Sequence, residues 1–472
     1  MSREKSLIKN TIIITIGKIC TQLITFIMLP IYTAILSTEE YGIIDLLNTL
    51  VFLCIPIVTL QIEQALFRRL IDSRENELEI KNTISTTIIT VIVQSIIYLV
   101  IFCAVAPAIH NNYKYFLATN VIASIFSGIM IQIVRGLGDN KKYAIGSFIT
   151  AFTIVMLNIV FIIGFRLGVY GMLAANLIGN IFCSIYIFIT KKVYKYINVN
   201  SFSKDLLKRL WRYSIPLIPN AISWWIFDSS DRIIVSTILG TAQNGILAAA
   251  YKFSSVYIAI YNVFNITWTE SASLHIDDED SSEFFSNIIN TVLKLFTAIC
   301  FGIIAFMPFV FPVMINEKFG EAYNHIPILM LSSLFNVVVG LLGVIYIAKK
   351  DTKTIAKTSS MAAIINLIFN LLLIKFIGLY AASLSTLAAY LIMTIYRLYN
   401  IKKYITLKLD KRFVIISIIF LVGLICSYYI NNLYLNVIIC LITIVYAWLV
   451  NKNSIQLIID MMKSKFLKRS FK

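Results

Sequence analysis

The sequence predicts an all-α polytopic membrane protein with about fourteen transmembrane helices. Of the 472 residues, 59% are hydrophobic and only 14% are charged, whereas a soluble chain carries about a quarter charged residues. Apolar segments long enough to span a bilayer recur as far as the C-terminus, which indicates helices rather than barrel strands. The first segment begins after Lys9 and is too long for the apolar core of a signal peptide, so we expect it to belong to the mature protein.

Polar or glycine-bearing breaks separate successive apolar segments, as at residues 37–40, 136–140 and 316–320. A window of about 20 residues per span then delimits the elements. The predicted spans are 10–36, 42–66, 82–109, 113–134, 143–165, 168–190, 213–239, 244–268, 284–315, 322–348, 355–376, 378–398, 413–430 and 433–450.

The net charge of +17 comes from basic residues that gather in every second loop, with Arg397 and Lys402 counted in one such loop. Short loops rich in Lys and Arg stay cytoplasmic, so both termini are predicted to be cytoplasmic. One segment, 268–280, belongs to the cytoplasmic series of alternate loops but contains no Lys or Arg. Because the basic residues are divided among short loops, they favour attraction to anionic lipid over nucleic-acid binding. The opposite loops hold only Lys114, Arg166, Lys318 and Lys375.

An internal repeat divides the chain. Residues 33–43 align with 236–246 at a shift of 203, sharing Ile-Leu, Thr and Gly-Ile, and 139–143 align with 351–355 at a shift of 212. The repeat predicts two pseudo-symmetric six-helix lobes in parallel orientation, and duplication around a midplane site is a recurring plan of transporters. The predicted domains are an N-lobe at 1–193, a basic cytoplasmic linker at 194–211, a C-lobe at 212–400, and helices 13 and 14 with a basic tail at 401–472.

Catalytic and metal-binding patterns are absent from the sequence. No loop exceeds about 20 residues, which leaves no room for a soluble catalytic domain. There is no P-loop, dinucleotide fingerprint or nucleophile elbow. The seven cysteines form no close pair, and His110, His275 and His325 lie far apart at expected loop edges. We therefore expect a protein that is not an enzyme and that has no metal site and no cofactor.

Charged residues inside the predicted spans concentrate on the hairpins that open the two lobes. Such a charge near the bilayer centre costs at least about 2.5–3.5 kcal/mol, so each needs a partner, water or a function. Lys294 also lies in a span, but it is near enough to the helix end to reach the interface. If the hairpins face each other, they line a polar cavity. The charges are Lys18 and Asp45 in the first lobe, and Asp228, Asp231, Arg232 and Lys252 in the second.

Structural roles also account for several of these charges. Asp228 and Arg232 are spaced i,i+4 and could neutralise each other on one helix face. Asp231 points elsewhere and needs another partner, such as Lys252 or Lys18, while Lys18 could extend to the interface. Trp224 and Trp225 precede the charges and could stack on a sugar, although packing is the simpler interpretation.

The two hairpins resemble those of Wzx-type polysaccharide flippases. The first carries L29-P-I-Y-T-A-I-L-S-T-E-E-Y-G-I-I-D45, and the second carries Y213-S-I-P-L-I-P219 followed by S230-D-R-I-I-V-S-T-I-L-G240. The resemblance covers about residues 5–400. It implies a two-lobed MATE-like protein of the multidrug/oligosaccharidyl-lipid/polysaccharide exporter superfamily. Such a protein flips an undecaprenyl-pyrophosphate-linked oligosaccharide to the outer leaflet of the bacterial cell membrane for surface polysaccharide biosynthesis.

The resemblance also implies a site and partners. Lys18, Arg232 and Lys252 occupy positions where the family's central cavity receives the anionic headgroup. The interleaved Asp45, Asp228 and Asp231 leave room for gating or for coupling to H+ or Na+. The implied partners are the lipid-linked oligosaccharide, membrane lipids, a polysaccharide polymerase and glycosyltransferases.

Two alternatives remain open at this point. A cation-coupled MATE-type multidrug exporter would use the three aspartates, and the three cavity cations count against it. A polytopic glycan polymerase or ligase usually needs a large extracytoplasmic loop, which this sequence does not have.

Overall fold

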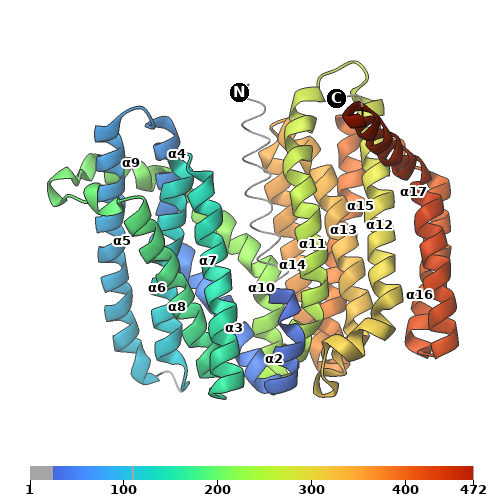
Figure 1. The fold of residues 1–472 in the computed structure, drawn as a ribbon, viewed down its shortest axis with the longest axis horizontal. Coiled ribbons are helices and arrows are strands. Elements are labelled where there is room, and N and C mark those ends of the chain that lie inside the picture. Colours follow the sequence, from blue (N-terminus) through green and yellow to red (C-terminus); the bar gives the residue numbers. More distant parts are fainter. Residues whose placement is uncertain (1–24, 109–110, 471–472) are drawn as a thin grey trace. The chain divides into compact units, whose positions relative to one another are not determined.

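The computed structural model describes residues 25–108 and 111–470, with no side chains described at 228, 453–455 and 457–470, and this part is helical without strands (Figure 1). Twelve described helices are long and apolar enough to cross a membrane, and a shorter apolar helix covers Thr25–Ile35. A further helix, Ile218–Ile238, has spanning length but carries three charges. The predicted all-α polytopic fold is therefore confirmed, while Lys18 lies outside the described residues.

The chain divides into two compact units, Met1–Ala248 and Ala249–Lys472, and the division falls inside the long helix α11, Thr241–His275. The lobe boundaries expected from the sequence remain a prediction. Besides the start of α11, unit 1 contains α2 (Leu29–Ile35), α3 (Thr38–Thr59), α4 (Ile62–Asp72), α5 (Glu77–Val105), α6 (Lys114–Gly136), α7 (Asn140–Asn158), α8 (Gly168–Thr190), α9 (Lys204–Ser214) and α10 (Ile218–Ile238). Unit 2 continues with α12 (Ser281–Met314), α13 (Ala322–Ala348), α14 (Thr352–Ile377), α15 (Tyr380–Asn400), α16 (Lys411–Ile430) and α17 (Leu433–Ser470).

The predicted span 42–66 is wrong in one respect, because the structure ends α3 at Thr59 and begins α4 at Ile62. Leu60 and Gln61 between them have φ angles of 52° and 59°. This left-handed backbone costs roughly 1–2 kcal/mol per non-glycine residue. The Thr59 hydroxyl accepts the Gln61 amide at 3.2 Å and stabilises the turn. Neither residue type signals a break, so the apolar run hides it.

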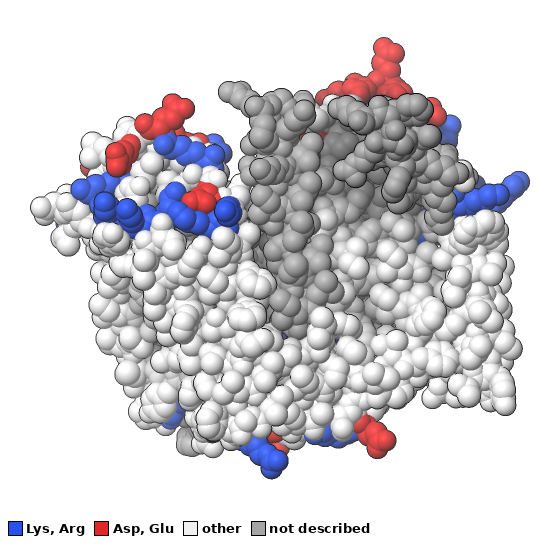
Figure 2. Space-filling model, in the orientation of Figure 1, with Lys and Arg blue, Asp and Glu red and all other residues white. Residues whose placement is uncertain are grey.

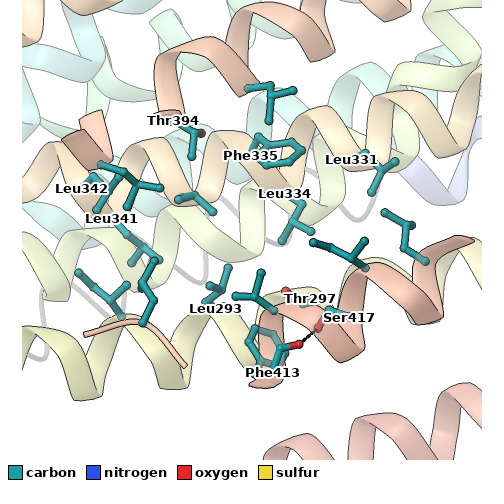
Figure 3. A pocket seen from close by; sticks show the side chains of 18 of the residues that line it. Leu293, Thr297, Leu331, Leu334, Phe335, Leu341, Leu342, Thr394, Phe413 and Ser417 are labelled. Atoms are coloured by element: carbon teal, nitrogen blue, oxygen red, sulfur yellow. Dashed lines mark hydrogen bonds between the residues drawn. The ribbon is translucent and has the colours of Figure 1, made fainter. Parts of the chain in front are cut away.

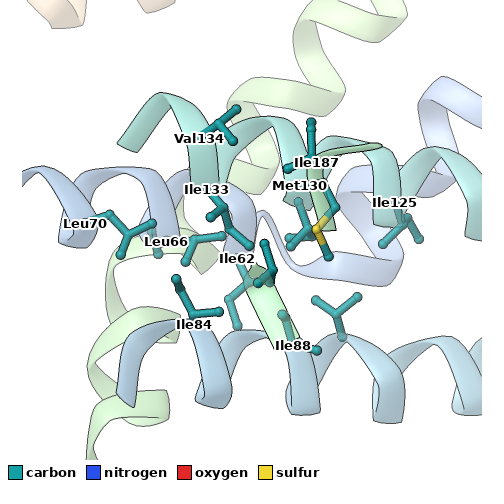
Figure 4. Close-up of a cluster of buried hydrophobic side chains, with 14 of the residues drawn as sticks. Ile62, Leu66, Leu70, Ile84, Ile88, Ile125, Met130, Ile133, Val134 and Ile187 are labelled. Atoms are coloured by element: carbon teal, nitrogen blue, oxygen red, sulfur yellow. The ribbon is translucent and has the colours of Figure 1, made fainter. Parts of the chain in front are cut away.

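The core of unit 1 explains why α4 is a separate helix (Figure 4). Ile62, Leu66 and Leu70 recur every fourth residue, so they form one stripe along α4. That stripe faces Ile84 of α5 and Ile133 of α6, and all five side chains are buried. The expected linker 194–211 is also folded in part, since α9 buries Leu206 and Leu210 in this cluster.

The outer surfaces of both units suit a bilayer. On the face that Figure 2 shows, charged side chains gather at the ends of the helices, and the coloured surface between them is almost free of charge. On one face of α5 the large apolar residues Ile96, Ile97, Val100 and Ile101 are all exposed. Exposed apolar helices with internally satisfied backbones are stable in lipid rather than in water. The chain is therefore a multi-pass membrane protein.

The repeat at a shift of 212 is present in the backbone. Asp139 caps α7 by accepting the Lys142 amide at 3.2 Å, and Asp351 caps α14 by accepting the Thr354 amide at 3.1 Å. The residues just before them, Gly138 and Lys350, both have positive φ angles, 78° and 59°. Lys350 thus adopts a conformation that its glycine counterpart adopts without strain.

The assignment of Arg397 to a basic cytoplasmic loop is wrong. The structure buries this residue in α15 with 3% exposure. Its Nη1 donates to the Val339 carbonyl at 2.7 Å, and Nη2 donates to the Thr358 hydroxyl at 2.8 Å. Its guanidinium also lies 5.7 Å from the centre of the Tyr346 ring. These contacts join α13, α14 and α15, so Arg397 has a structural role inside unit 2. His325, expected at a loop edge, is likewise buried within α13.

Candidate functional site

The candidate site of unit 1 is an ion pair between α3 and α10. Arg232 Nε lies 2.8 Å from Asp45 Oδ2, and each side chain is 21% exposed. Two opposite charges at this distance relieve much of the cost of placing either one in a membrane span. Arg232 Nε itself is buried, while other parts of both side chains remain partly exposed.

Hydrogen bonds from two side chains, Trp225 and Asn244, position this pair. Trp225 of α10 donates its indole Nε1–H to the Thr49 carbonyl of α3 at 2.9 Å. Asn244, which is fully buried near the start of α11, donates to the Gly42 carbonyl at 2.9 Å, and its amide nitrogen is 3.5 Å from Asp45 Oδ2. Three helices are therefore fixed around Asp45. Asn244 was missed in the sequence because it carries no charge, and its only signal was its place beside the repeated Gly245.

The helices α3 and α11 cross at the glycines that the repeat aligns. A Cβ atom on Gly42 would clash with the Thr241 carbonyl, and one on Gly245 would clash with the Thr38 carbonyl. Thr38 and Thr241 are themselves related by the shift of 203, as are the two glycines. The contact is thus reciprocal, which is the signature of a local two-fold relation between matched segments.

The predicted site residues are only partly brought together. Asp45 and Arg232 form the ion pair, and Asp231 is buried in the same helix with 3% exposure. Asp228 lies in α10, but its side chain is not among those described. Lys252 is half-buried in the part of α11 that belongs to unit 2.

The two tryptophans of α10, and a lysine that was excluded from the site, have structural partners. Trp225 is tied to α3, while Trp224 is exposed and packs edge-on against Phe227 with ring centres 6.4 Å apart. Lys294 was left out of the site at the sequence level, and it pairs with Asp410 at 2.7 Å. The Lys294 ammonium, together with the hydrogen bond from the Phe413 amide, holds the pKa of Asp410 below its usual range.

Unit 2 has a cavity of different character, with a volume of about 320 Å³ (Figure 3). Its walls come from α12, α13, α15 and α16, and they include Leu293, Leu334, Phe335 and Phe413. The few polar groups in the lining are hydroxyls, and that of Ser417 is bonded to the Phe413 carbonyl at 2.7 Å. Such a lining suits hydrocarbon and offers nothing to an anionic headgroup. Among the described residues, no three His, Cys, Asp or Glu side chains come together as a metal site.

Comparison with known proteins decides the family. The polysaccharide biosynthesis protein family matches residues 7–269, more than half of the chain. The chain belongs to this family. A relative of this family member in Methanocaldococcus jannaschii, the uncharacterized membrane protein MJ1375, is 26% identical over 317 residues, or 62% of this chain and 73% of the relative.

The fold of this polysaccharide biosynthesis family member is shared with solved transporters. The lipid II flippase MurJ in an inward closed conformation superimposes with a TM-score of 0.70, covering 95% of this chain and 100% of MurJ at 15% identity. An inward-facing MATE family multidrug resistance transporter of the MOP superfamily gives a TM-score of 0.67, covering 83% and 98% at 13% identity. At these identities the likeness establishes the fold, and it confirms the MATE-like architecture predicted from the sequence.

Proposed function

We propose that this protein is a flippase that moves an undecaprenyl-pyrophosphate-linked oligosaccharide from the cytoplasmic to the outer leaflet of a bacterial cell membrane. The substrate crosses unchanged, so the proposed act is transport rather than catalysis. Membership of a polysaccharide biosynthesis family and the flippase-like fold support the class of protein. Both termini are proposed to be cytoplasmic. A polymerase and glycosyltransferases are the proposed functional partners.

The observation that carries the proposal is the ion pair between the partly exposed side chains of Arg232 and Asp45. A guanidinium presents two parallel N–H donors that match two phosphate oxygens, which suits it to a pyrophosphate better than a lysine would be. Its present partner offers a single negative charge. A pyrophosphate offers more, so it can displace the Asp45 carboxylate from Arg232. Lys18 and Lys252 are the further cations proposed to receive the headgroup.

We propose that the Asp45 carboxylate, once displaced from Arg232, controls the next step of the transport cycle. Once Arg232 turns to the substrate, Asp45 loses its counter-ion in a site that is only partly hydrated, and uptake of H+ or binding of Na+ removes that penalty. When the substrate leaves, Asp45 recaptures Arg232 and α3 is again tied to α10. We propose Asp228 and Asp231 as further coupling or gating groups on α10. In this cycle, lobe movement by alternating access is linked to the presence of the headgroup.

The test distinguishes binding of the substrate headgroup by Arg232 from a purely structural ion pair with Asp45. Arg232→Ala should lower transport of the lipid-linked oligosaccharide in proteoliposomes about tenfold or more, since charge-assisted bonds contribute roughly 1.5–3 kcal/mol each. Arg232→Lys should retain part of the activity. The double variant Asp45→Arg, Arg232→Asp restores a pair between the helices but moves the cation to α3. It should recover membrane abundance without recovering transport.

A matched control removes another close pair, with Lys294→Ala and Asp410→Ala, whose atoms are 2.7 Å apart in unit 2. Its transport per folded molecule should stay near that of the wild type. Full transport by Arg232→Ala at matched abundance, or full recovery by the charge-swapped variant, would show that the ion pair is structural and would overturn the proposed site.

A cation-coupled multidrug exporter is the second candidate function. Asp231 favours it, because a carboxyl group with 3% exposure inside a helix of spanning length is a suitable carrier for a coupling proton. Vesicles containing the protein would then extrude a cationic dye under a proton or sodium gradient. Dye extrusion that depends on Asp231, combined with no flipping of lipid-linked oligosaccharide, would favour this function over the first.

A further inference from the structure

Unit 1 contains a basic pocket that lies apart from the residues of the candidate site. Its volume is about 440 Å³, enough for a phosphate with a small attached group. Four lysines and one glutamate provide its charge, a formal net of +3. The lining is Glu77, Leu78, Lys81, Lys191, Lys192, Lys195 and Tyr196.

The pocket sits where two membrane spans end. Glu77, Leu78 and Lys81 belong to the first turns of α5, and Lys191 follows directly after the last residue of α8, Thr190. The ends of spans are the depth at which lipid headgroups lie. By the alternation of basic loops, this is the predicted cytoplasmic side, where the leaflet surface is negatively charged.

The lysines of the pocket are held in place by the backbone rather than projecting from a loose loop. Lys192 has a left-handed conformation with φ of 54°, which turns the chain sharply after α8. Ser85 of α5 bonds the Tyr196 carbonyl and accepts the Asn198 amide at 3.1 Å, and Thr86 accepts the Ser203 amide at 3.2 Å. The segment after α8 is therefore fastened to α5, and two chain segments form one pocket.

Most of this charge has no ion-pair partner in the part of the chain that the structure describes. Lys191 lies 3.4 Å from Asp139, whereas Lys81, Lys192 and Lys195 form no ion pair with any described residue. The negative end of the α8 helix dipole attracts an ammonium group, which accounts for a lysine directly after α8. It does not account for Lys81, which lies on another helix. Glu77 offsets only part of this charge, and a hollow that stays net positive attracts an anion with several oxygens.

The neighbouring helix α9 indicates the source of that anion. Its Leu206 and Leu210 are buried in the core of unit 1. The basic residues on its outer face are exposed, namely Lys204, Lys208, Arg209 and Arg212. A helix with this division lies at the interface and is attracted to anionic lipid. In Figure 2, basic side chains gather at the end of unit 1 where Figure 1 places α9.

We propose that this pocket binds the phosphate headgroup of a lipid in the adjacent leaflet. The ammonium groups of Lys81, Lys192 and Lys195 contact the phosphate oxygens, and the acyl or prenyl chain extends along the apolar sides of α5 and α8. The ligand chemistry is a lipid-borne phosphate, either the phosphodiester of an anionic phospholipid or a polyprenyl pyrophosphate. The pocket holds the lipid next to unit 1 and does not depend on the ion pair of Arg232.

The experiment is a lysine-labelling footprint of the full chain in nanodiscs. Discs of phosphatidylcholine alone are compared with discs containing about 30 mol% phosphatidylglycerol, with discs containing undecaprenyl pyrophosphate, and with phosphatidylcholine discs plus soluble inorganic pyrophosphate. We expect labelling of Lys81 and Lys195 to slow about fivefold or more with at least one of the two anionic lipids, which corresponds to about 1 kcal/mol per lysine. Lys402 and Lys452, exposed lysines elsewhere on the chain, are the controls.

Each outcome decides the matter. Protection by phosphatidylglycerol identifies the phospholipid, and protection by undecaprenyl pyrophosphate alone identifies the polyprenyl headgroup. Equal protection of Lys402 and Lys452 would mean diffuse surface attraction, and protection by soluble pyrophosphate alone would mean a free anion. Either result, or no protection, overturns the proposal. Lys195→Gln should reduce the protection of Lys81, whereas Lys402→Gln should not, and both should remain folded because the replaced side chains are exposed or partly exposed.

Discussion

Two kinds of region show the internal repeat in different ways. At the crossing of α3 and α11, the matched residues Gly42 and Gly245 touch each other reciprocally. At the helix starts near Asp139 and Asp351, by contrast, each copy of the repeat makes its own contacts. Where copies touch, a change in one strains both. Where they do not touch, each copy is free to diverge, and the structure shows that they have.

We name the two separate sites the first corner, comprising Asp139, Lys142 and Lys191, and the second corner, comprising Asp351, Thr354, Lys403 and Tyr404. Each has an aspartate cap and a lysine 52 residues later, at 3.4 Å in the first corner and 3.3 Å in the second. The third partner differs. Asp139 has the Lys142 ammonium at 3.3 Å, whereas Asp351 accepts the hydroxyls of Thr354 and Tyr404, each at 2.6 Å.

The largest predicted effect is at the crossing. Gly42→Ala and Gly245→Ala each place a Cβ against a carbonyl oxygen of the partner helix, and backbone atoms cannot move aside as a flexible side chain can. We expect membrane abundance and transport to fall about tenfold for both, as overpacking by more than 1 kcal/mol predicts. Quantitative immunoblotting and transport assays measure this.

The controls for the crossing are Gly128→Ala and Gly302→Ala. A Cβ at either position meets no atom within 4 Å, so both variants should match the wild type. Because the contact is reciprocal, the two crossing variants should be impaired to similar extents. A strong effect at Gly42 with none at Gly245 would contradict the two-fold relation.

The sequence predicted this repeat but not how its copies meet. Hydropathy and spacing identify α3, α10 and α11 as helices and align Gly42 with Gly245, yet they contain no information on tertiary contact. For the same reason, the i,i+4 spacing pointed only to Asp228 on the same helix as a partner of Arg232, which stays a prediction, and it could not identify Asp45 of α3. Arg397 was assigned to a loop because its hydroxyl and carbonyl partners lie 39 and 58 residues away.

The second predicted effect compares the corners by removing their aspartates. Asp351→Ala leaves the Thr354 amide and the hydroxyls of Thr354 and Tyr404 without their acceptor, whereas Asp139→Ala removes one amide acceptor and two surface ion pairs. Loss of an N-cap costs about 1 kcal/mol at Asp139, and ion pairs near the surface add little. We expect Asp351→Ala to lower the apparent melting temperature in detergent more than Asp139→Ala does. The reverse order would mean that the ion pairs, not the hydroxyls, stabilise the corners.

The third prediction concerns acid. The hydroxyls of Thr354 and Tyr404 hold the pKa of Asp351 well below its usual range. Partial burial raises the pKa of Asp139, but the Lys142 hydrogen bonds and the charges of Lys191 and Lys142 outweigh it, so the net pKa is also lowered. A carboxyl whose pKa is depressed by folding stabilises the protein above its unfolded pKa of about 3.9, and this contribution is lost as pH falls through the folded value.

We therefore expect the difference in melting temperature between the wild type and Asp351→Asn to be constant from about pH 7 to 5 and to shrink below about pH 4. Thermal unfolding in detergent over this range measures it. Asp205, an exposed aspartate in the first turn of α9, supplies the control through Asp205→Asn. A difference for Asp351→Asn that stays constant down to pH 3 would show that the carboxylate charge is not what stabilises the second corner.

The smallest predicted effect tests whether the third partner of the first corner matters at all. The Lys142 ammonium lies 3.3 Å from Asp139 in an i,i+3 pair whose side chains are 29% and 24% exposed. Such pairs contribute about 0.2–0.5 kcal/mol, and Lys142→Ala leaves both the cap and Lys191 in place. The melting temperature should change by less than in Tyr404→Phe, which removes a 2.6 Å bond to Asp351. A larger decrease for Lys142→Ala than for Tyr404→Phe would contradict the divergence that the contacts indicate. The ammonium of Lys142 would then stabilise the first corner at least as strongly as the hydroxyl of Tyr404 stabilises the second.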